Sequence, residues 1–163
     1  MRGFLKKEYQ ERTLRLQKKM QDNNIDVILI TSPHNFRYFT GLDSYFWESP
    51  TRPWFLLIPQ INDPIAVIPS IGKTALKNTW IKRINTWPSP QPEDEGVSAL
   101  TNSLKKLIMN KANIGCELGK ESHLRMSVND FDQLRKNMSN HHFIDASKII
   151  WDLRIIKSDN EIK

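Results

Sequence analysis

Residues 45–54 are the part of this sequence best suited to recognising a small molecule. They read YFWESPTRPW, so four aromatic residues, two prolines and Arg52 lie together between two predicted elements. Loops carry binding residues more often than cores do. Aromatic rings exclude water, and a guanidinium binds a carboxylate through two parallel hydrogen bonds. The segment therefore suits a small substrate with a carboxylate, although its composition is equally compatible with rings that only pack the loop.

A self-contained catalytic or metal site is not predicted elsewhere in the chain. His34, His123, His141, His142 and Cys116 show none of the H-x-x-x-H, C-x-x-C or H-E-x-x-H spacings that are typical of metal sites. The G-x-S-x-G elbow of serine hydrolases and the P-loop are also absent from the sequence. We therefore assign no catalytic residue and no metal ligand to this chain.

Hydrophobic periodicity predicts strands and helices that alternate along the chain. Strands are expected at residues 25–30, 54–58, 65–68, 84–87, 112–117 and 143–144, with the second and third paired as a hairpin. Helices are expected at residues 6–22, 33–40, 72–80, 97–108 and 128–138, and from Asp145 or Ser147 through Ile156. This order predicts an α/β domain in which helices flank a largely parallel or mixed β-sheet.

The net charge of +6 and the pI near 9.5 permit two interpretations. One is nucleic-acid binding. The other is that the basic residues lie on solvated helix faces, and we favour it because no basic arm or aromatic-basic motif accompanies the charge. The residues so interpreted are Lys6, Lys7, Arg12, Arg15, Lys18 and Lys19 in the first helix, and the scattered Lys105, Lys106, Lys111, Lys120, Arg135 and Lys136.

The sequence also predicts that neither a membrane nor a nucleic acid is a partner. Its apolar runs fall short of the ~18 residues that a transmembrane helix needs. Residues 1–21 lack the apolar core and cleavage site of a secretory signal. The single Cys116 cannot form an internal disulfide, which fits a reducing compartment. We expect a cytoplasmic protein.

The last residues indicate a second structural unit. Ser158 and Glu161 have the S-x-x-E spacing of a capping box, which opens a helix. A helix of one turn is not stable alone. We therefore expect residues 1–157 to form one domain and residues 158–163 to begin a linker helix into a further domain.

Two stretches resemble the N-terminal domain of the creatinase/prolidase/aminopeptidase P family. The first is the predicted strand beginning Ile25-Asp26-Val27 followed by residues 31–41 (TSPHNFRYFTG). The second is Asp145-Ala146-Ser147 followed by residues 153–158 (LRIIKS) and Glu161-Ile162, a stretch that in this family leads into the catalytic domain. The resemblance covers residues from about 11 to 163.

The resemblance implies a fold similar to the ribonuclease H-like layout, followed by a C-terminal pita-bread catalytic domain. In peptidase members that domain holds two divalent metal ions, usually manganese or cobalt, through two Asp, one His and two Glu. Members are commonly homodimers in which this domain helps to close the partner's active site. In creatinase-like members an aromatic residue and an arginine before the second strand reach the substrate carboxylate. Arg52 matches that arginine, and Phe46 or Trp47 matches the ring.

The expected function is therefore that of a non-catalytic domain of a Xaa-Pro dipeptidase- or aminopeptidase-like metallohydrolase. The chain by itself is expected to be inactive and to contribute to oligomerisation and to closing the site around a small peptide or amide. The parent enzyme could instead cleave a small C–N bond, as creatine and ectoine hydrolases do. A stand-alone binding or dimerisation module is the third alternative.

Overall fold

A six-stranded sheet with helices on both faces forms the domain. The computed structural model describes residues 3–49 and 52–162. The strands are β1 (Val27–Ile30), β2 (Phe55–Pro59), β3 (Ile65–Pro69), β4 (Arg83–Trp87), β5 (Asn113–Cys116) and β6 (His142–Asp145). The helices are α1 (Lys6–Asp22), α2 (Pro33–Thr40), α3 (Lys73–Lys77), α4 (Val97–Leu107), α5 (Val128–Asn137), α6 (Ser147–Ile155) and α7 (Asp159–Ile162). Short 3₁₀ turns, η1 (Tyr45–Glu48) and η2 (Ser70–Gly72), complete the described elements.

The sheet is mixed, with the strand order β4-β3-β2-β1-β5-β6. The hairpin expected between the second and third strands is present, because β2 and β3 pair antiparallel. Strand β2 also pairs antiparallel with β1, whereas β1, β5 and β6 run parallel to one another. Strand β4 pairs parallel with β3 at the opposite edge. The predicted mixed α/β architecture is therefore confirmed.

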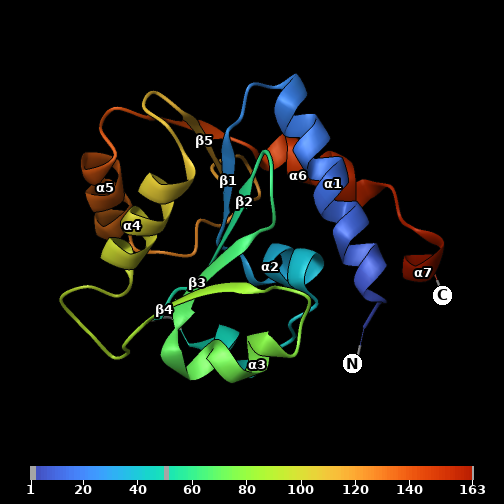
Figure 1. Cartoon of the computed structure of the whole chain (residues 1–163), viewed down its shortest axis with the longest axis horizontal. Coiled ribbons are helices and arrows are strands. Elements are labelled where there is room, and N and C mark those ends of the chain that lie inside the picture. Colours follow the sequence, from blue (N-terminus) through green and yellow to red (C-terminus); the bar gives the residue numbers. More distant parts are fainter. Residues whose placement is uncertain (1–2, 50–51, 163) are drawn as a thin grey trace.

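Helices cover both faces of the sheet, and each face has its own apolar core. Figure 1 shows α4 and α5 on one side of the strands and α1, α2 and α6 on the other. In β1, Ile28 and Ile30 join the core beneath α1, α2 and α6, while Val27 and Leu29 join the core beneath α4 and α5. Successive residues of a strand point to opposite faces. This alternation explains why the first strand is apolar at every position.

Two apolar residues in segments predicted to be helical are exposed. Val128 is the first residue of α5 and is 79% exposed, whereas Leu134 in the same helix is fully buried. Ile156 follows the end of α6 in extended backbone and is 71% exposed. In both cases the predicted helix includes a terminal residue that lies beyond the turns packed on the sheet. Ser127 caps the start of α5, because its hydroxyl accepts from the Asp130 N–H at 3.0 Å.

Within residues 3–49 and 52–162, no helix has both the length and the apolar character that a membrane crossing requires.

Candidate functional site

The carboxyl ends of the parallel strands β1 and β5 meet at the centre of the sheet. Leu29 lies opposite Cys116 in the register, so the residues that follow these strands are neighbours. The chain leaves β1 into α2 on one face and leaves β5 towards α5 on the other face. In α/β sheets, ligands bind at such a switch point, outside the carboxyl ends of the strands. The residues around this position therefore form the candidate site.

A buried carboxylate, that of Glu117, lies at the switch point. The residue is 2% exposed. One of its oxygens accepts from the main-chain N–H groups of Thr31 and Ser32, at 2.6 and 2.9 Å, and from the Thr31 hydroxyl at 3.0 Å. The other accepts from the Ser32 hydroxyl and from Asn35 Nδ2, each at 2.5 Å. A buried charge is tolerated when its hydrogen-bonding capacity is filled in this way.

Glu117 also changes the role expected of Ser32. Ser32 directly precedes the predicted helix at residues 33–40, a position where a serine side chain commonly caps the helix. Ser32 does occupy the N-cap position of α2, but its side chain makes no capping hydrogen bond. Its hydroxyl donates to Glu117 instead. The start of α2 is thus held by a residue 85 positions away in the chain, which no local pattern could indicate.

The aromatic residues of the predicted binding segment form a ring cluster against the core. Trp47 lies 5.1 Å from Trp54 and 5.1 Å from Phe36 between ring centroids, and Phe46 stacks on Trp54 at 6.1 Å. Trp54 is 1% exposed, whereas Phe46 is 39% and Tyr45 is 90% exposed. Part of the cluster therefore packs the loop. Tyr45 and Phe46 still present ring surface to a partner or ligand.

Arg52 lies in the loop before β2 with its backbone in the left-handed region, at φ 63°. Such backbone is unfavourable for a residue with a Cβ and persists when the surroundings impose it. Its Nε is buried without a hydrogen-bond partner among the described residues. An unpaired buried donor costs about 1–3 kcal/mol. The structure thus holds the predicted arginine in an unusual conformation with unused donor capacity. Residues 50 and 51 of the predicted segment lie outside the described residues.

A second arginine, Arg125, reaches the same loop from the connection between β5 and α5. Its Nη2 donates to the carbonyl oxygen of Trp47 at 2.6 Å and to that of Ser49. Its guanidinium carbon lies 5.6 Å from the centroid of the Trp47 ring. Burial lowers the pKa of Arg125 from its ordinary value. Nothing in the sequence distinguished this residue, because it belongs to no periodic stripe and matches no motif.

His34, near the start of α2, makes part of the stability depend on pH. Burial lowers the pKa of His34, and the charges of Arg154 and His123 lower it further, while Glu117 partly offsets them. The unfolded chain therefore binds a proton at a pH where folded His34 resists it, so stability falls as pH drops below about 6.5. We expect His34→Gln to flatten this dependence, measured by urea unfolding at several pH values between about 7.5 and 5. Equal slopes in variant and wild type would contradict the prediction.

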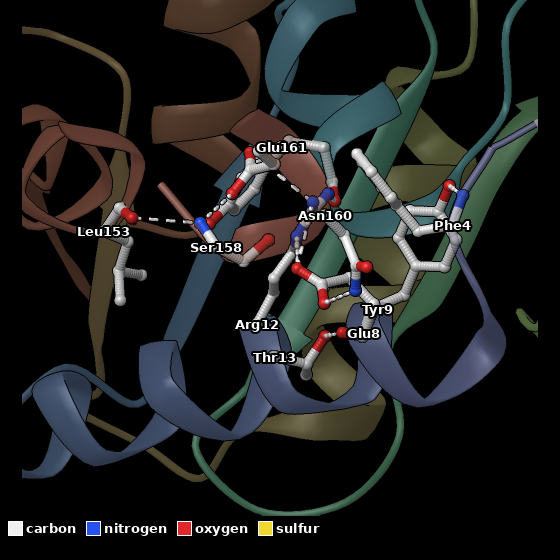
Figure 2. A network of polar contacts seen from close by, with 10 residues as sticks. Phe4, Glu8, Tyr9, Arg12, Thr13, Leu153, Ser158, Asn160 and Glu161 are labelled. Atoms are coloured by element: carbon white, nitrogen blue, oxygen red, sulfur yellow. Dashed lines mark hydrogen bonds and ion pairs between the residues drawn. The ribbon is translucent and has the colours of Figure 1, made fainter. Parts of the chain in front are cut away.

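A separate polar centre joins α1 to the C-terminal residues. Figure 2 shows Arg12 of α1 facing Glu8 and Glu161. Arg12 Nη2 lies 3.2 Å from a Glu8 oxygen and 3.4 Å from a Glu161 oxygen, and Nη1 donates to the Tyr38 carbonyl at 2.9 Å. Arg12 is 2% exposed. Its assignment to a solvated helix face was therefore wrong, because long-range partners satisfy its charge.

Aromatic rings complete the surroundings of the Arg12 guanidinium. The ring centroids of Phe4, Tyr9 and Tyr38 lie 4.5, 5.4 and 4.3 Å from its central carbon. A cation is attracted to the face of an aromatic ring, more strongly when water is excluded. Tyr9 therefore contacts the Arg12 guanidinium as well as packing in the core.

The C-terminal turn α7 is held by this centre. The Ser158 N–H donates to Glu161 at 3.0 Å, which is the glutamate half of the predicted capping box. Asn160 donates to Glu8 at 3.2 Å. Burial on its own would raise the pKa of Glu8, but hydrogen bonds from Ser158 and Asn160 and the Arg12 charge lower it overall. These contacts explain how a helix of four residues keeps a defined position.

The described residues bring Arg52, Trp47 and Phe46 into one loop but add no metal ligands to it. No group of three or more His, Cys, Asp or Glu in the described part of the chain could hold a metal ion. The donor set here, guanidinium and indole N–H groups, suits an anion rather than a cation. We therefore derive no metal-dependent step from these residues.

The sequence and the fold were compared with those of known proteins. A family model described as the creatinase/prolidase N-terminal domain matches residues 12–156. An uncharacterized hydrolase/peptidase of Sinorhizobium fredii is 29% identical over 98% of this chain and 41% of its own length. An uncharacterized peptidase of Staphylococcus epidermidis is 27% identical over 90% of this chain and 37% of its own. The chain thus spans about two fifths of the length of these curated relatives.

Solved structures share the fold. The prolidase of Thermococcus sibiricus superposes with a TM-score of 0.79 at 19% identity, over 98% of this chain and 40% of that one. The N-terminal domain of the cytoplasmic peptidase PepQ of Mycobacterium tuberculosis superposes with a TM-score of 0.66 at 17% identity, over 88% of this chain and 98% of that one. The second comparison is with a domain whose structure was solved on its own.

Proposed function

Because the chain belongs to the creatinase/prolidase N-terminal domain family, we propose that it is the non-catalytic domain of a Xaa-Pro dipeptidase- or aminopeptidase-like metallohydrolase. The observation that carries this proposal is the match of the family model to residues 12–156, together with relatives more than twice as long as the chain. Catalysis, and the two divalent metal ions that the resemblance implies, would belong to a C-terminal domain. This domain would then act on substrate binding rather than on bond cleavage.

Arg52 is the residue proposed to meet the substrate. Its unpaired Nε supports this role, because a carboxylate would supply the acceptor that the described residues do not. The exposed Phe46 ring would cover the apolar part of a small peptide, and Trp47 would hold the loop against the core. Binding of the carboxylate would orient the peptide towards the catalytic domain, in the same subunit or in the partner of a homodimer.

We expect removal of the Arg52 guanidinium to weaken the use of substrates with a free carboxylate. In the full-length protein, Arg52→Ala should lower kcat/KM for such an Xaa-Pro peptide about 30-fold, which corresponds to about 2 kcal/mol of lost charge-assisted binding. The same peptide with a C-terminal amide should be affected much less. Steady-state kinetics on both substrates measures the difference.

Arg52→Gly provides the matched control for backbone conformation. Glycine adopts the left-handed region without strain. The free energy of unfolding of this variant should therefore be at least that of Arg52→Ala, and the variant should lose the same substrate preference. An unchanged kcat/KM in both variants removes Arg52 from the site.

Hydrolysis of a creatine-like substrate in place of the peptide would assign the parent to the C–N hydrolases instead. Light-scattering masses of the same preparations would test the expected homodimer.

A further inference from the structure

Arg125 fastens the aromatic segment to the rest of the domain. Its Nη2 donates to two carbonyl groups of that segment, those of Trp47 and Ser49, and its guanidinium lies against the Trp47 ring. Both acceptors are main-chain atoms, so the contact fixes the course of the backbone rather than one side chain. The Trp47 ring also packs against Phe36 and Trp54, and ring contacts restrict direction less than hydrogen bonds do.

The main chain of Arg125 ties the same residue to the switch point. Its N–H donates to the Thr31 hydroxyl at 3.0 Å, and that hydroxyl donates to Glu117 at 3.0 Å. A continuous set of hydrogen bonds therefore runs from the buried carboxylate, through Thr31 and Arg125, to the carbonyl of Trp47. A single residue, Arg125, therefore fixes the position of the aromatic segment relative to the carboxyl ends of β1 and β5.

Arg125 and the segment 45–54 contain buried donors without acceptors among the described residues. Arg125 Nη1, Trp47 Nε1 and Arg52 Nε are all buried and have no hydrogen-bond partner within residues 3–49 and 52–162. All three atoms can only donate, and two of them belong to cations. A loop that served packing alone would gain from apolar residues at these positions. A carboxylate bound by Arg52 would supply the acceptor that its Nε lacks among the described residues.

We propose that Arg125 is the positioning residue of the substrate-binding loop, holding the backbone around Trp47 so that Arg52 is presented to the carboxylate of the substrate. This inference rests on the proposed function of Arg52. Arg125 acts through the loop and is not a catalytic residue. Its planar guanidinium is suited to the task because one nitrogen bonds two carbonyl groups while the plane lies near the indole. Lysine could keep the charge and one of these bonds.

The positioning is tested first in the 163-residue chain. Related N-terminal domains have been solved on their own, as with the PepQ domain, so the isolated chain is a suitable sample. We expect Arg125→Met to increase hydrogen exchange at least tenfold in residues 44–49, with Arg125→Lys intermediate. Exchange in α1 and β1 should not change. Arg135→Met, at an arginine whose side chain is 59% exposed in α5, is the matched control and should leave the loop unchanged. Unchanged loop exchange in Arg125→Met would overturn the inference.

The consequence for binding is tested in the full-length protein. Arg125→Met should raise KM about tenfold for the peptide with a free carboxylate, with little change in kcat, and should leave the C-terminal amide unaffected. Arg125→Lys should recover part of the loss, which a variant that merely unfolds would not do. If Arg52→Ala raises KM and Arg125→Met does not, the proposed function stands and the positioning role is refuted. If Arg52→Ala has no effect, the proposed function has failed and the inference falls with it.

Discussion

A Glu117→Ala variant is expected to unfold with about 3–5 kcal/mol less free energy than the wild-type chain. The substitution removes the acceptor of five hydrogen bonds from Thr31, Ser32 and Asn35 at a site that is 2% exposed. Each buried donor left without an acceptor costs about 1–3 kcal/mol. Because a typical domain is stable by only about 5–15 kcal/mol, the variant should lie close to unfolding. Urea unfolding followed by far-ultraviolet circular dichroism at neutral pH measures the loss.

Two further variants separate the buried carboxylate from general effects of substitution. Glu117→Gln should lose less than Glu117→Ala, because its amide oxygen can still accept from the N–H groups of Thr31 and Ser32. Its amide nitrogen would then face Asn35 Nδ2, donor against donor, so some loss remains. Glu121→Ala, an exposed glutamate in the same connection, should stay within about 0.5 kcal/mol of wild type. A loss below about 1 kcal/mol in Glu117→Ala would show that water replaces the carboxylate without cost.

Replacement of Arg12 is expected to have an effect of similar size at the other polar centre. Arg12→Met keeps most of the side-chain volume but leaves the carboxylates of Glu8 and Glu161 without their cation, at side-chain exposures of 9% and 15%. Breaking a buried pair in this way costs about 3–5 kcal/mol. Arg12→Ala should cost more, since the packing against the Tyr38 ring is lost as well. The free energy of unfolding of each variant checks this order.

Two experiments control the Arg12 prediction, a substitution at an exposed arginine and a double-mutant cycle. Arg15→Met changes an exposed arginine of the same helix and should be nearly neutral. A double-mutant cycle of Arg12→Met with Glu161→Gln should give a coupling energy of about 0.5–3 kcal/mol. A coupling near zero would mean that the 3.4 Å contact between Arg12 and Glu161 adds nothing to the attachment of α7. Amide exchange of residues 159–162 would then be the same in wild type and Arg12→Met.

The two polar centres hold different parts of the domain in place. Glu117 and Arg125 fix the aromatic segment relative to the carboxyl ends of the central strands. Arg12 and Glu161 fix α7, which lies at the C-terminal side of the domain in Figure 1. If a catalytic domain follows, as we propose, both centres would influence how the substrate is positioned relative to that domain. One would set the position of Arg52, and the other would set the direction in which the chain continues.

The local pattern of the sequence determined the elements and the class of the fold. Hydrophobic periodicity predicted a helix at residues 6–22, and α1 has these bounds, Lys6–Asp22. Continuous apolar runs and proline-bounded turns located β1 and the hairpin of β2 with β3 to within two residues. Gly41 ends α2 in the left-handed region, at φ 77°, which a glycine after a helix commonly adopts. These features depend on side-chain spacing and on backbone preference within a few residues, which a sequence displays directly.

The tertiary structure alone decided which polar residues matter. Arg12 and Arg15 look equivalent in a basic helix, yet only Arg12 meets carboxylates and rings from distant segments. Glu117 and Arg125 carry no sequence signal, because their partners lie 76 to 94 positions away. Burial makes a charge depend on partners brought together by the whole fold. Local spacing thus sufficed for the scaffold, whereas the contacts that hold the aromatic segment in place required the packed chain.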